Sequence, residues 1–357
     1  MVCLKNANIN KVIILETKIV KTDISNIDSN QIAELGRILS TGGLVAFPTE
    51  TVYGLGANAY DDNAVQNIFK AKGRPSDNPL IVHFADVGDI KDAVLEINEK
   101  AKLLFDTFSP GPLTVILKKS EKISKTVTAG LDTVAVRIPS NPIAQALIKA
   151  SGVPIAAPSA NLSGKPSPTT SKHVIDDMCG RIDAIIDGGN CEVGVESTVI
   201  DLSGEIPVIL RPGGITYEQI CSVLPNAVID KHILKSVSAD EIPKCPGMKY
   251  KHYAPDADVT VVEGKICDVR NKITSLLYRQ TGRTGVMTVG NAEYKADLVI
   301  NVGEDNKAYA KNLFKVLREF DENNIDVVFA EFSYDDGYGL AVKNRLYKSA
   351  GNKVILV

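Results

Sequence analysis

The chain has 357 residues, which is enough for about two domains, since domains commonly have ~100 to 200 residues. With 44% hydrophobic and 23% charged residues, its composition is that of an ordinary soluble globular protein. The net charge of −3 excludes attraction of the whole molecule to nucleic acid, so an RNA contact would require a local basic patch. No apolar run reaches the ~18 residues of a membrane span and the first residues lack a signal-peptide pattern, which predicts a cytoplasmic protein.

The six cysteines are scattered along the chain, without C-x-x-C spacing and with only four histidines in the sequence. This pattern argues against a structural zinc site and predicts reduced thiols in a reducing compartment. The residues are Cys3, Cys179, Cys191, Cys221, Cys245 and Cys267.

Residues 1–235 alternate short apolar runs with segments of helical periodicity, which predicts an α/β domain. Strands are expected at 12–15, 44–47, 81–84, 113–117, 133–139, 153–157, 184–186, 197–201 and 208–214. Helices are expected around 32–39, from Asp61 or Asp62 to the residues before Gly73, at 90–105, from Asn141 through Leu147, and from Thr216 onward.

Three cations gather where the second of these helices must end, in Lys70-Ala71-Lys72-Gly73-Arg74. Gly73 and the following Pro75 prevent the helix from continuing, so the charge is fixed at a corner. Cations in a last helical turn also complement the helix dipole, and this alternative needs no ligand. Hydroxyls, amides and glycines at the strand ends Thr49–Gly56 and Ser159–Asn161 favour a phosphate or carboxylate site instead.

Two polar residues lie inside apolar strands. A lone His83 in such a strand is most simply a satisfied core or edge residue. Arg137 must reach water, an acidic partner or a bound anion, because an unpaired buried charge costs several kcal/mol; we expect the anion. Arg211, at a strand end beside Gly213-Gly214, offers a second place for phosphate.

Several common catalytic motifs are absent from the sequence. Gly54-Leu55-Gly56 lacks the third glycine of a dinucleotide fingerprint, and Gly164-Lys165 lacks the remainder of a P-loop. We find no convincing nucleophile, no Ser-His-Asp order and no paired carboxylates. A site of cations, hydroxyls and one amide is suited to stabilising a phosphoryl transition state by positioning and electrostatics, without a covalent intermediate.

The hydrophobic periodicity fails from about Ser236 to Asp256. Within it, Pro243–Pro255 carries two Tyr, three Lys and one His, whereas a plain linker would be polar and low in aromatics. This segment is therefore expected to bind something. Beyond it, alternating strands and helices predict a small parallel α/β sheet of Rossmann-like type with a regulatory, lid-positioning or interaction role. Strands are expected at 258–263, 285–289, 298–302, 326–332 and 353–357, and helices at 269–278, 308–320 and 340–350.

Lys72-Gly73-Arg74 together with Ser159-Ala160-Asn161 resembles the KxR and SxN motifs of the YrdC/Sua5 family, the threonylcarbamoyl-AMP synthases. Phe47–Gly56 and Lys70–Leu80 resemble that family nearly letter for letter, and 243–255 resembles the PGMxYxHYAP linker of its long, Sua5-type members. The resemblance implies a twisted mixed-sheet, YrdC-like catalytic domain at 1–235, a lid over the active site at 236–256, and a Rossmann-like C-terminal domain at 257–357.

The implied activity is that of a nucleotidyltransferase that makes threonylcarbamoyl-AMP. In this family L-threonine and bicarbonate give N-carboxythreonine, whose carboxylate attacks the α-phosphate of ATP, and pyrophosphate leaves. The product is the donor for the t6A modification of tRNA. Mg²⁺ is expected to accompany ATP, held mostly by substrate and water. tRNA and the downstream threonylcarbamoyl transferase are expected as further partners, and a membrane is not.

The resemblance also assigns roles residue by residue. It places Thr51, His83, Arg137, Ala157 through its backbone, and Ser197 around threonine. It places Lys72, Arg74, Asn78, Thr133, Ser159, Ser167 and Arg211 around ATP. The catalytic motif residues are Lys72, Arg74, Ser159 and Asn161, and the lid residues are Lys249, Tyr250 and Tyr253.

Two other functions stay open. A carbamoyl-adenylate-forming enzyme like the maturation factor of nickel-iron hydrogenases would also need C-x-x-C zinc-finger repeats and an acylphosphatase-like region, which this sequence lacks. A non-catalytic regulator could instead hold the backbone of tRNA or double-stranded RNA with the Lys70–Arg74 corner, although the overall acidity speaks against it.

Overall fold

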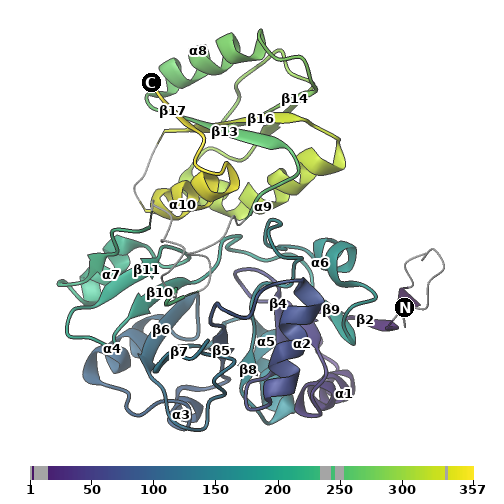
Figure 1. The fold of residues 1–357 in the computed structure, drawn as a ribbon, viewed down its shortest axis with the longest axis vertical. Helices are drawn as coiled ribbons and strands as arrows, with labels where there is room; N and C mark the ends of the chain where they lie inside the picture. Colours follow the sequence, from purple (N-terminus) through teal and green to yellow (C-terminus); the bar gives the residue numbers. More distant parts are fainter. Residues whose placement is uncertain (1, 4–14, 234–242, 246–252, 334–336) are drawn as a thin grey trace. The chain divides into compact units, whose positions relative to one another are not determined.

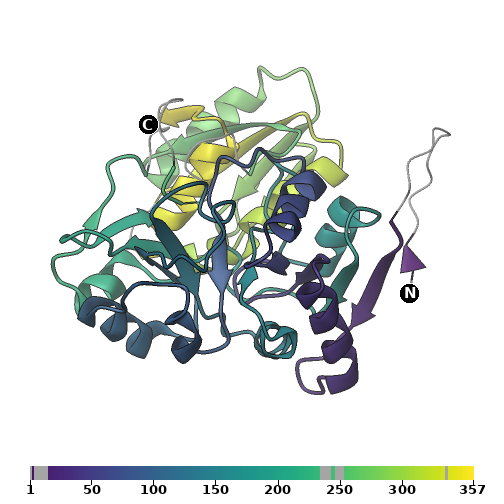
Figure 2. The same ribbon diagram turned by 60° about the horizontal axis from the view of Figure 1, so that its bottom comes forward.

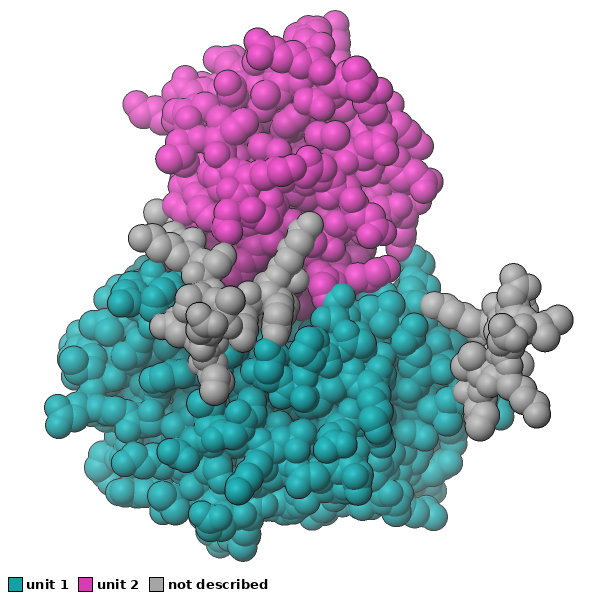
Figure 3. Space-filling view, in the orientation of Figure 1, with its two compact units in different colours: residues 1–163, 168–192, 196–249 teal, residues 164–167, 193–195, 250–357 magenta. Residues whose placement is uncertain are grey.

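The computed structural model describes residues 2–3, as backbone only, and residues 15–233, 243–245, 253–333 and 337–357. It divides into two compact units, which Figure 3 colours separately and which are described here one at a time. Unit 1 comprises Met1–Ser163, Pro168–Glu192 and Glu196–Lys249. Unit 2 comprises Gly164–Ser167, Val193–Val195 and Tyr250–Val357. The strand expected at 12–15 falls outside the described residues, except for Leu15, which has no regular structure.

Unit 1 is built on a mixed sheet, as expected (Figure 1). Among the described residues it has 12 strands in the order β1-β2-β9-β3-β4-β8-β5-β7-β6-β10-β11-β12. The strands are β1 (Val2–Cys3), β2 (Thr17–Lys21), β3 (Val45–Phe47), β4 (Gly54–Asn58), β5 (Ile81–His83), β6 (Leu113–Lys118), β7 (Thr133–Arg137), β8 (Ile155–Ala156), β9 (Ala184–Asp187), β10 (Thr198–Asp201), β11 (Val208–Arg211) and β12 (Val228–Ile229).

The helices of unit 1 begin at capping side chains that the sequence provides. Asp61 caps α2 by accepting hydrogen bonds from the backbone of Asn63 and Ala64, and Gly73 ends this helix in the left-handed region at φ 62°. The described helices of this unit are α1 (Ser29–Ser40), α2 (Asp62–Lys72), α3 (Val87–Ile90), α4 (Glu99–Phe108), α5 (Pro142–Ser151), α6 (Ser171–Met178) and α7 (Tyr217–Val223).

A hydrophobic core of unit 1 lies between α1, α5 and the sheet, and Figures 1 and 2 show the two helices side by side. Leu35 and Leu39 of α1 meet Ile143 and Leu147 of α5, all fully buried. The helix backbones approach closely at Gly36, where an added Cβ would lie 2.6 Å from the carbonyl carbon of Ala150. The contact therefore requires glycine at this position.

One helix expected from the sequence is wrong. Residues 90–105 do not form a continuous helix, because α3 ends at Ile90 and α4 begins only after Asn98. The Asn98 side chain accepts a hydrogen bond from the backbone of Ala101, and this cap starts a new helix inside the expected one. Strands β2, β4 and β12 and helix α6 are also absent from the elements expected from the sequence; two glycines interrupt the pattern of β4, and β12 and α6 are short.

Unit 2 contains a parallel sheet in the order β15-β14-β16-β13-β17, as expected for a Rossmann-like α/β unit. Figure 1 shows α8 over one face of this sheet and α9 with α10 over the other. Its described elements are β13 (Asp258–Glu263), α8 (Ile266–Leu277), β14 (Thr284–Thr288), β15 (Leu298–Asn301), α9 (Asn306–Glu322), β16 (Val327–Phe332), α10 (Gly339–Ser349) and β17 (Val354–Leu356).

The structure corrects the expectation that all cysteines are reduced. Cys179 is disulfide-bonded, whereas Cys191, Cys221, Cys245 and Cys267 are free. Spacing in the sequence could not reveal this, because a disulfide depends on the separation of two residues in the fold.

None of the helices in the described part of the chain is both long and apolar enough to cross a bilayer.

Candidate active site

Neighbouring strands of unit 1 bring distant polar residues to one face of the sheet. His83 at the end of β5 pairs with Arg137 at the end of β7, and Arg137 pairs on its other side with Thr114 of β6. Side chains of directly opposed residues project from the same face of a sheet, so these three form a line across it.

The line continues through hydrogen bonds to β10 and β11. The hydroxyls of Thr114 and Ser197 are 2.7 Å apart, and Ser197 directly precedes β10. Arg211, the last residue of β11, donates through Nη2 to Ser197 Oγ at 3.0 Å and through Nε and Nη2 to its carbonyl oxygen. We call this set, His83, Arg137, Thr114, Ser197 and Arg211, the polar row. It joins three of the threonine-site residues expected from the sequence to one of the expected ATP-site residues.

Arg137 has an acidic partner, the alternative that the sequence left beside a bound anion. Its Nη2 donates to Glu50 Oε1 at 2.6 Å and to Thr51 Oγ1 at 3.0 Å, and its Nε donates to Gly111 O at 3.4 Å. The side chains of Arg137 and Glu50 are only 5% and 7% exposed. A buried pair of this kind needs further hydrogen bonds, and Ser140 supplies one by donating its backbone N–H to Glu50 Oε2.

The KxR and SxN motifs meet in space although 87 residues separate Lys72 from Ser159. The Lys72 Nζ donates to Ser159 O at 2.5 Å and to Asn161 O at 2.7 Å, and Lys72 is buried. Ser159 Oγ donates to Asn161 Oδ1, and the Ala160 backbone donates to Tyr53 O. Lys72 therefore fixes the shape of the loop that carries Ser159 and Asn161.

Asn78 and His83 are among the side chains of unit 1 that have buried polar atoms without a hydrogen-bond partner in the described part of the chain; Thr22 and Ser109 are others. Neither polar atom of the Asn78 amide, nor Nδ1 of His83, has a hydrogen-bond partner among the described residues. Asn78 is fully buried, and Arg74 donates through Nη2 to its carbonyl oxygen at 3.4 Å. Buried polar groups are nearly always paired, so the unpaired atoms of Asn78 and His83 require an explanation, for which a bound ligand is proposed below.

His83 is uncharged at neutral pH. Burial lowers its pKa from 6.5 to about 3, and the nearby Arg137 charge adds to the shift. Its ring also packs edge-on against Phe47, with centroids 6.2 Å apart. A neutral imidazole here can exchange one hydrogen bond with a ligand without bringing a second positive charge beside Arg137.

Of the remaining expected residues, some lie elsewhere in unit 1, some lie in unit 2, and some lie outside the described residues. The Ala157 backbone N–H donates to Ile81 O, and Thr133 begins β7, at the opposite end of that strand from Arg137. Ser167 belongs to the segment Gly164–Ser167 of unit 2. Tyr253 also belongs to unit 2, where its ring lies 5.0 Å from that of Phe314. Lys249 and Tyr250 lie outside the described residues.

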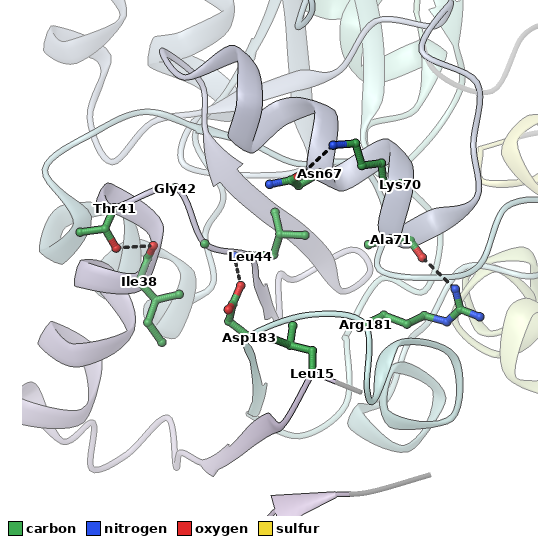
Figure 4. Close-up of a pocket in the computed structure, with 11 residues that line it drawn as sticks. Leu15, Ile38, Thr41, Gly42, Leu44, Asn67, Lys70, Ala71, Arg181 and Asp183 are labelled. Carbon is green, nitrogen blue, oxygen red and sulfur yellow. Dashed lines mark hydrogen bonds between the residues drawn. The ribbon is translucent and has the colours of Figure 1, made fainter. Parts of the chain in front are cut away.

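A cavity of about 560 Å³ lies in unit 1 at the beginning of β3 (Figure 4). Its lining includes Lys70, Arg181 and Asp183, together with Gly43 and Leu44 just before β3. Thr51, which accepts a hydrogen bond from Arg137 of the polar row, follows the opposite end of β3. The cavity is therefore separate from the polar row.

Lys70 lines this cavity, although the sequence analysis grouped it with the anion-holding cations. Lys70 and Lys72 are two residues apart on α2, which places them about 200° apart around the helix. The two lysines therefore project to different sides of α2.

The sequence analysis missed Glu50 and Thr114. Thr114 stands inside the apolar run Leu113–Leu117, where a single threonine is unremarkable in a strand. Glu50 stands between Thr49 and Thr51, and an acidic residue inside an expected anion site was the signal that could have drawn attention to it.

Side chains that commonly ligate metals do not cluster in the part of the chain that the structure describes. The described residues contain no group of three or more His, Cys, Asp or Glu side chains placed to hold a cation. The one carboxylate beside Arg137, that of Glu50, is engaged by protein donors at both oxygens.

Unit 1 is thus a mixed α/β domain in which strand pairing and hydrogen bonds bring two arginines, two hydroxyls and a histidine into one row. Residues 37–213 match a protein family described as "Telomere recombination" (Sua5, YciO and YrdC), and residues 215–351 match one described as "Threonylcarbamoyl-AMP synthase, C-terminal domain".

Two curated relatives are similar over most of the chain, and both are called threonylcarbamoyl-AMP synthase. The protein of Pyrococcus abyssi is 52% identical over 319 residues, covering 88% of this chain and 93% of the relative. The protein of Bacillus subtilis is 50% identical over 340 residues, covering 94% and 97%. A crystal structure of P. abyssi Sua5 complexed with L-threonine superposes with a TM-score of 0.92 at 48% identity, covering 96% of this chain and all of that one. The chain belongs to the Sua5 family of threonylcarbamoyl-AMP synthases.

Proposed function

We propose that this protein is an L-threonylcarbamoyladenylate synthase that converts L-threonine, bicarbonate and ATP into threonylcarbamoyl-AMP and pyrophosphate. The observation that carries the proposal is the polar row, which lines up Arg137 and Arg211 with hydroxyls and a neutral histidine. Such a row is suited to an amino acid at one end and a phosphate at the other. The names of its relatives and the threonine bound to the P. abyssi protein support the same substrate. The class of the reaction is nucleotidyl transfer, and the activity is the first step of t6A formation in tRNA.

The amino-acid subsite is proposed around Arg137. Its guanidinium is the natural partner of the threonine carboxylate, because charge-assisted, geometrically defined bonds to carboxylates are the strength of arginine. Thr51, Ser197 and the neutral His83 supply short polar groups for the ammonium and hydroxyl groups of threonine. The Ala157 backbone completes the subsite.

The nucleotide subsite is proposed around Arg74 and Arg211, with Asn78, Thr133, Ser159 and Ser167 as further contacts and Lys72 and Asn161 fixing the motif loop. Asn78 has an amide whose donor and acceptor atoms have no partner among the described residues, and an adenine or ribose edge can satisfy both. Arginine charge stabilises the phosphate as the N-carboxythreonine carboxylate attacks it and pyrophosphate leaves. No step requires a protein nucleophile.

Beyond the substrates, we propose that the protein acts in the cytoplasm on MgATP and supplies its product to a threonylcarbamoyl transferase that modifies tRNA. The lid role expected for Lys249, Tyr250 and Tyr253 remains part of this proposal.

The test measures pyrophosphate formed from ATP by the full-length protein. Release is expected only when threonine and bicarbonate are both present, with serine a much poorer substrate. Threonine-independent release would contradict the proposal. A non-catalytic RNA-binding role predicts the opposite result, namely no pyrophosphate and salt-dependent binding of tRNA without ATP.

A further inference from the structure

The loop after β3 carries a buried carboxylate that none of the assigned roles uses. Glu50 is 6% exposed and lies between Thr49 and Thr51. Its Oε1 accepts from Arg137 Nη2 at 2.6 Å and its Oε2 accepts from Ser140 N at 3.1 Å. Both carboxylate oxygens are thus engaged, so Glu50 is held in one orientation.

The hydrogen bonds of Arg137 leave one of its nitrogens for a ligand. Nε donates to Gly111 O, and Nη2 is shared between Glu50 and Thr51. Nη1 has no acceptor among the described residues. Glu50 therefore fixes the plane of the guanidinium and directs the remaining amino group.

The same contacts set the direction of the Thr51 hydroxyl. Thr49 Oγ1 lies 2.6 Å from Val52 O, which can only accept, so the Thr49 hydroxyl donates there. The contact of 2.8 Å between the Thr49 and Thr51 hydroxyls must then be a donation from Thr51. Thr51 Oγ1 in turn accepts from Arg137 Nη2. A chain of oriented bonds thus runs from Glu50 through Arg137 and Thr51 to Thr49.

Charge gives Glu50 a second effect. The pair of Arg137 and Glu50 sums to zero, and so does a zwitterionic amino acid with its ammonium and carboxylate groups. A simple carboxylate of the same shape would bring an uncompensated negative charge into a buried site, where charges interact strongly and desolvation is costly.

We propose that Glu50 is a positioning and specificity residue: it orients Arg137 and Thr51 for the substrate, and its charge makes the subsite select an amino acid over an anion that lacks the amino group. This inference rests on the proposed function and names a residue that acts within the same site. Glu50 acts through Arg137 and is not itself a catalytic residue.

The experiment compares threonine with 2,3-dihydroxybutanoate, in which a hydroxyl replaces the amino group, by calorimetric binding to the full-length protein. Glu50→Gln removes the charge with little change in size. It is expected to weaken threonine binding at least tenfold and to shift the ratio of the two dissociation constants at least fivefold toward dihydroxybutanoate. In steady-state kinetics, KM for threonine rises while KM for ATP stays within about twofold.

Two further variants keep the result interpretable. Glu192→Gln makes the same chemical change at an exposed side chain in unit 1 and is expected to behave as wild type. Glu50→Asp retains the charge on a shorter side chain, so it should lose affinity but keep the wild-type ratio. Thermal unfolding identifies a variant that does not fold, in which case Glu50→Asp carries the test: a ratio shifted as far as expected for Glu50→Gln would overturn the charge argument.

The outcomes separate this inference from the proposed function. A wild-type protein that binds no threonine contradicts the proposed function itself. Wild-type binding together with an unchanged ratio in a folded Glu50→Gln protein, or with equal increases in KM for threonine and ATP, contradicts the role of Glu50.

Discussion

A buried polar cluster of unit 2 and two buried polar side chains of unit 1 differ in how completely their hydrogen bonds are made. In unit 2, the fully buried Glu331 accepts from Arg270 Nε, Thr288 Oγ1, Val289 N and the Tyr294 hydroxyl. In unit 1, the Asn78 amide and His83 Nδ1 have no partner among the described residues. A completed cluster stabilises its own fold, whereas an incomplete one keeps bonding capacity for a ligand.

The largest expected effect is on the completed cluster. Glu331→Ala leaves the buried Thr288 hydroxyl and three partly buried donors without their acceptor, so the free energy of unfolding should fall by about 3–5 kcal/mol in total, since each unpaired buried donor costs ~1–3 kcal/mol. Urea denaturation measures the change. Glu293→Ala, at an exposed position of unit 2, is the control and should have little effect. Equal losses in the two variants would remove the distinction between the clusters.

In the proposed site of unit 1, the expected effect falls on activity. Arg74→Ala and Arg137→Ala should each lower the rate of pyrophosphate formation well over tenfold, because charge-assisted bonds are worth ~1.5–3 kcal/mol. Arg37→Ala, on the exposed side of α1, should retain the full rate. Unchanged kinetics in both site variants would mean that the site is misplaced.

His83 connects the site to pH. Its pKa in the folded protein is about 3, below the 6.5 of an ordinary histidine, so the unfolded chain binds the extra proton first as pH falls. His83 therefore lowers the free energy of unfolding progressively from pH 6.5 toward pH 3, by at most ~1.4 kcal/mol per pH unit. His83→Asn should flatten this dependence, measured as the difference between wild-type and variant denaturation curves at each pH. Parallel curves would show that the histidine is charged or exposed.

The smallest expected effect is on stability, and it tests most directly whether the Asn78 amide lacks hydrogen-bond partners within the protein. Asn78→Leu removes an amide without partners among the described residues, so the free energy of unfolding should stay the same or rise by roughly 1 kcal/mol, while ATP binding weakens. Asn141→Leu makes the same change at the cap of α5, whose side chain accepts from Ile143 N and Ala144 N, and should cost about 1 kcal/mol. Urea denaturation measures the stability of both variants, and calorimetry measures their binding of ATP. A destabilised Asn78→Leu protein would show that the amide has partners within the fold and would contradict this prediction.

The spacing of apolar residues predicted most helices and strands, because each element must bury one face and therefore repeats apolar residues at its own period. Strand β13 lies at Asp258–Glu263 as expected, and α2 ends at Gly73 because only glycine readily takes the left-handed conformation there. The break after Ile90 was missed because the apolar spacing continues through it, although Asn98 forms a new cap.

The site was predictable only in part. The resemblance linked Lys72 to Ser159 and Asn161, which the structure brings into contact. Glu50 lies in the loop after β3, and Arg137 is the last residue of β7. Their pairing depends on how the fold brings these two segments together, and no local sequence pattern predicts that. Thr114 joins the polar row through strand pairing alone.

The polar row ties the proposed substrate site to the alignment of the strands. Because side chains alternate between sheet faces, displacing β7 by a single residue would turn Arg137 toward the opposite face and present Val136 in its place. Insertions or deletions within β5, β6 or β7 should therefore abolish ligand binding even where the core tolerates them, whereas exchanges of one side chain for another leave the alignment intact. In this protein, chain length between turns is as much a determinant of substrate recognition as residue identity.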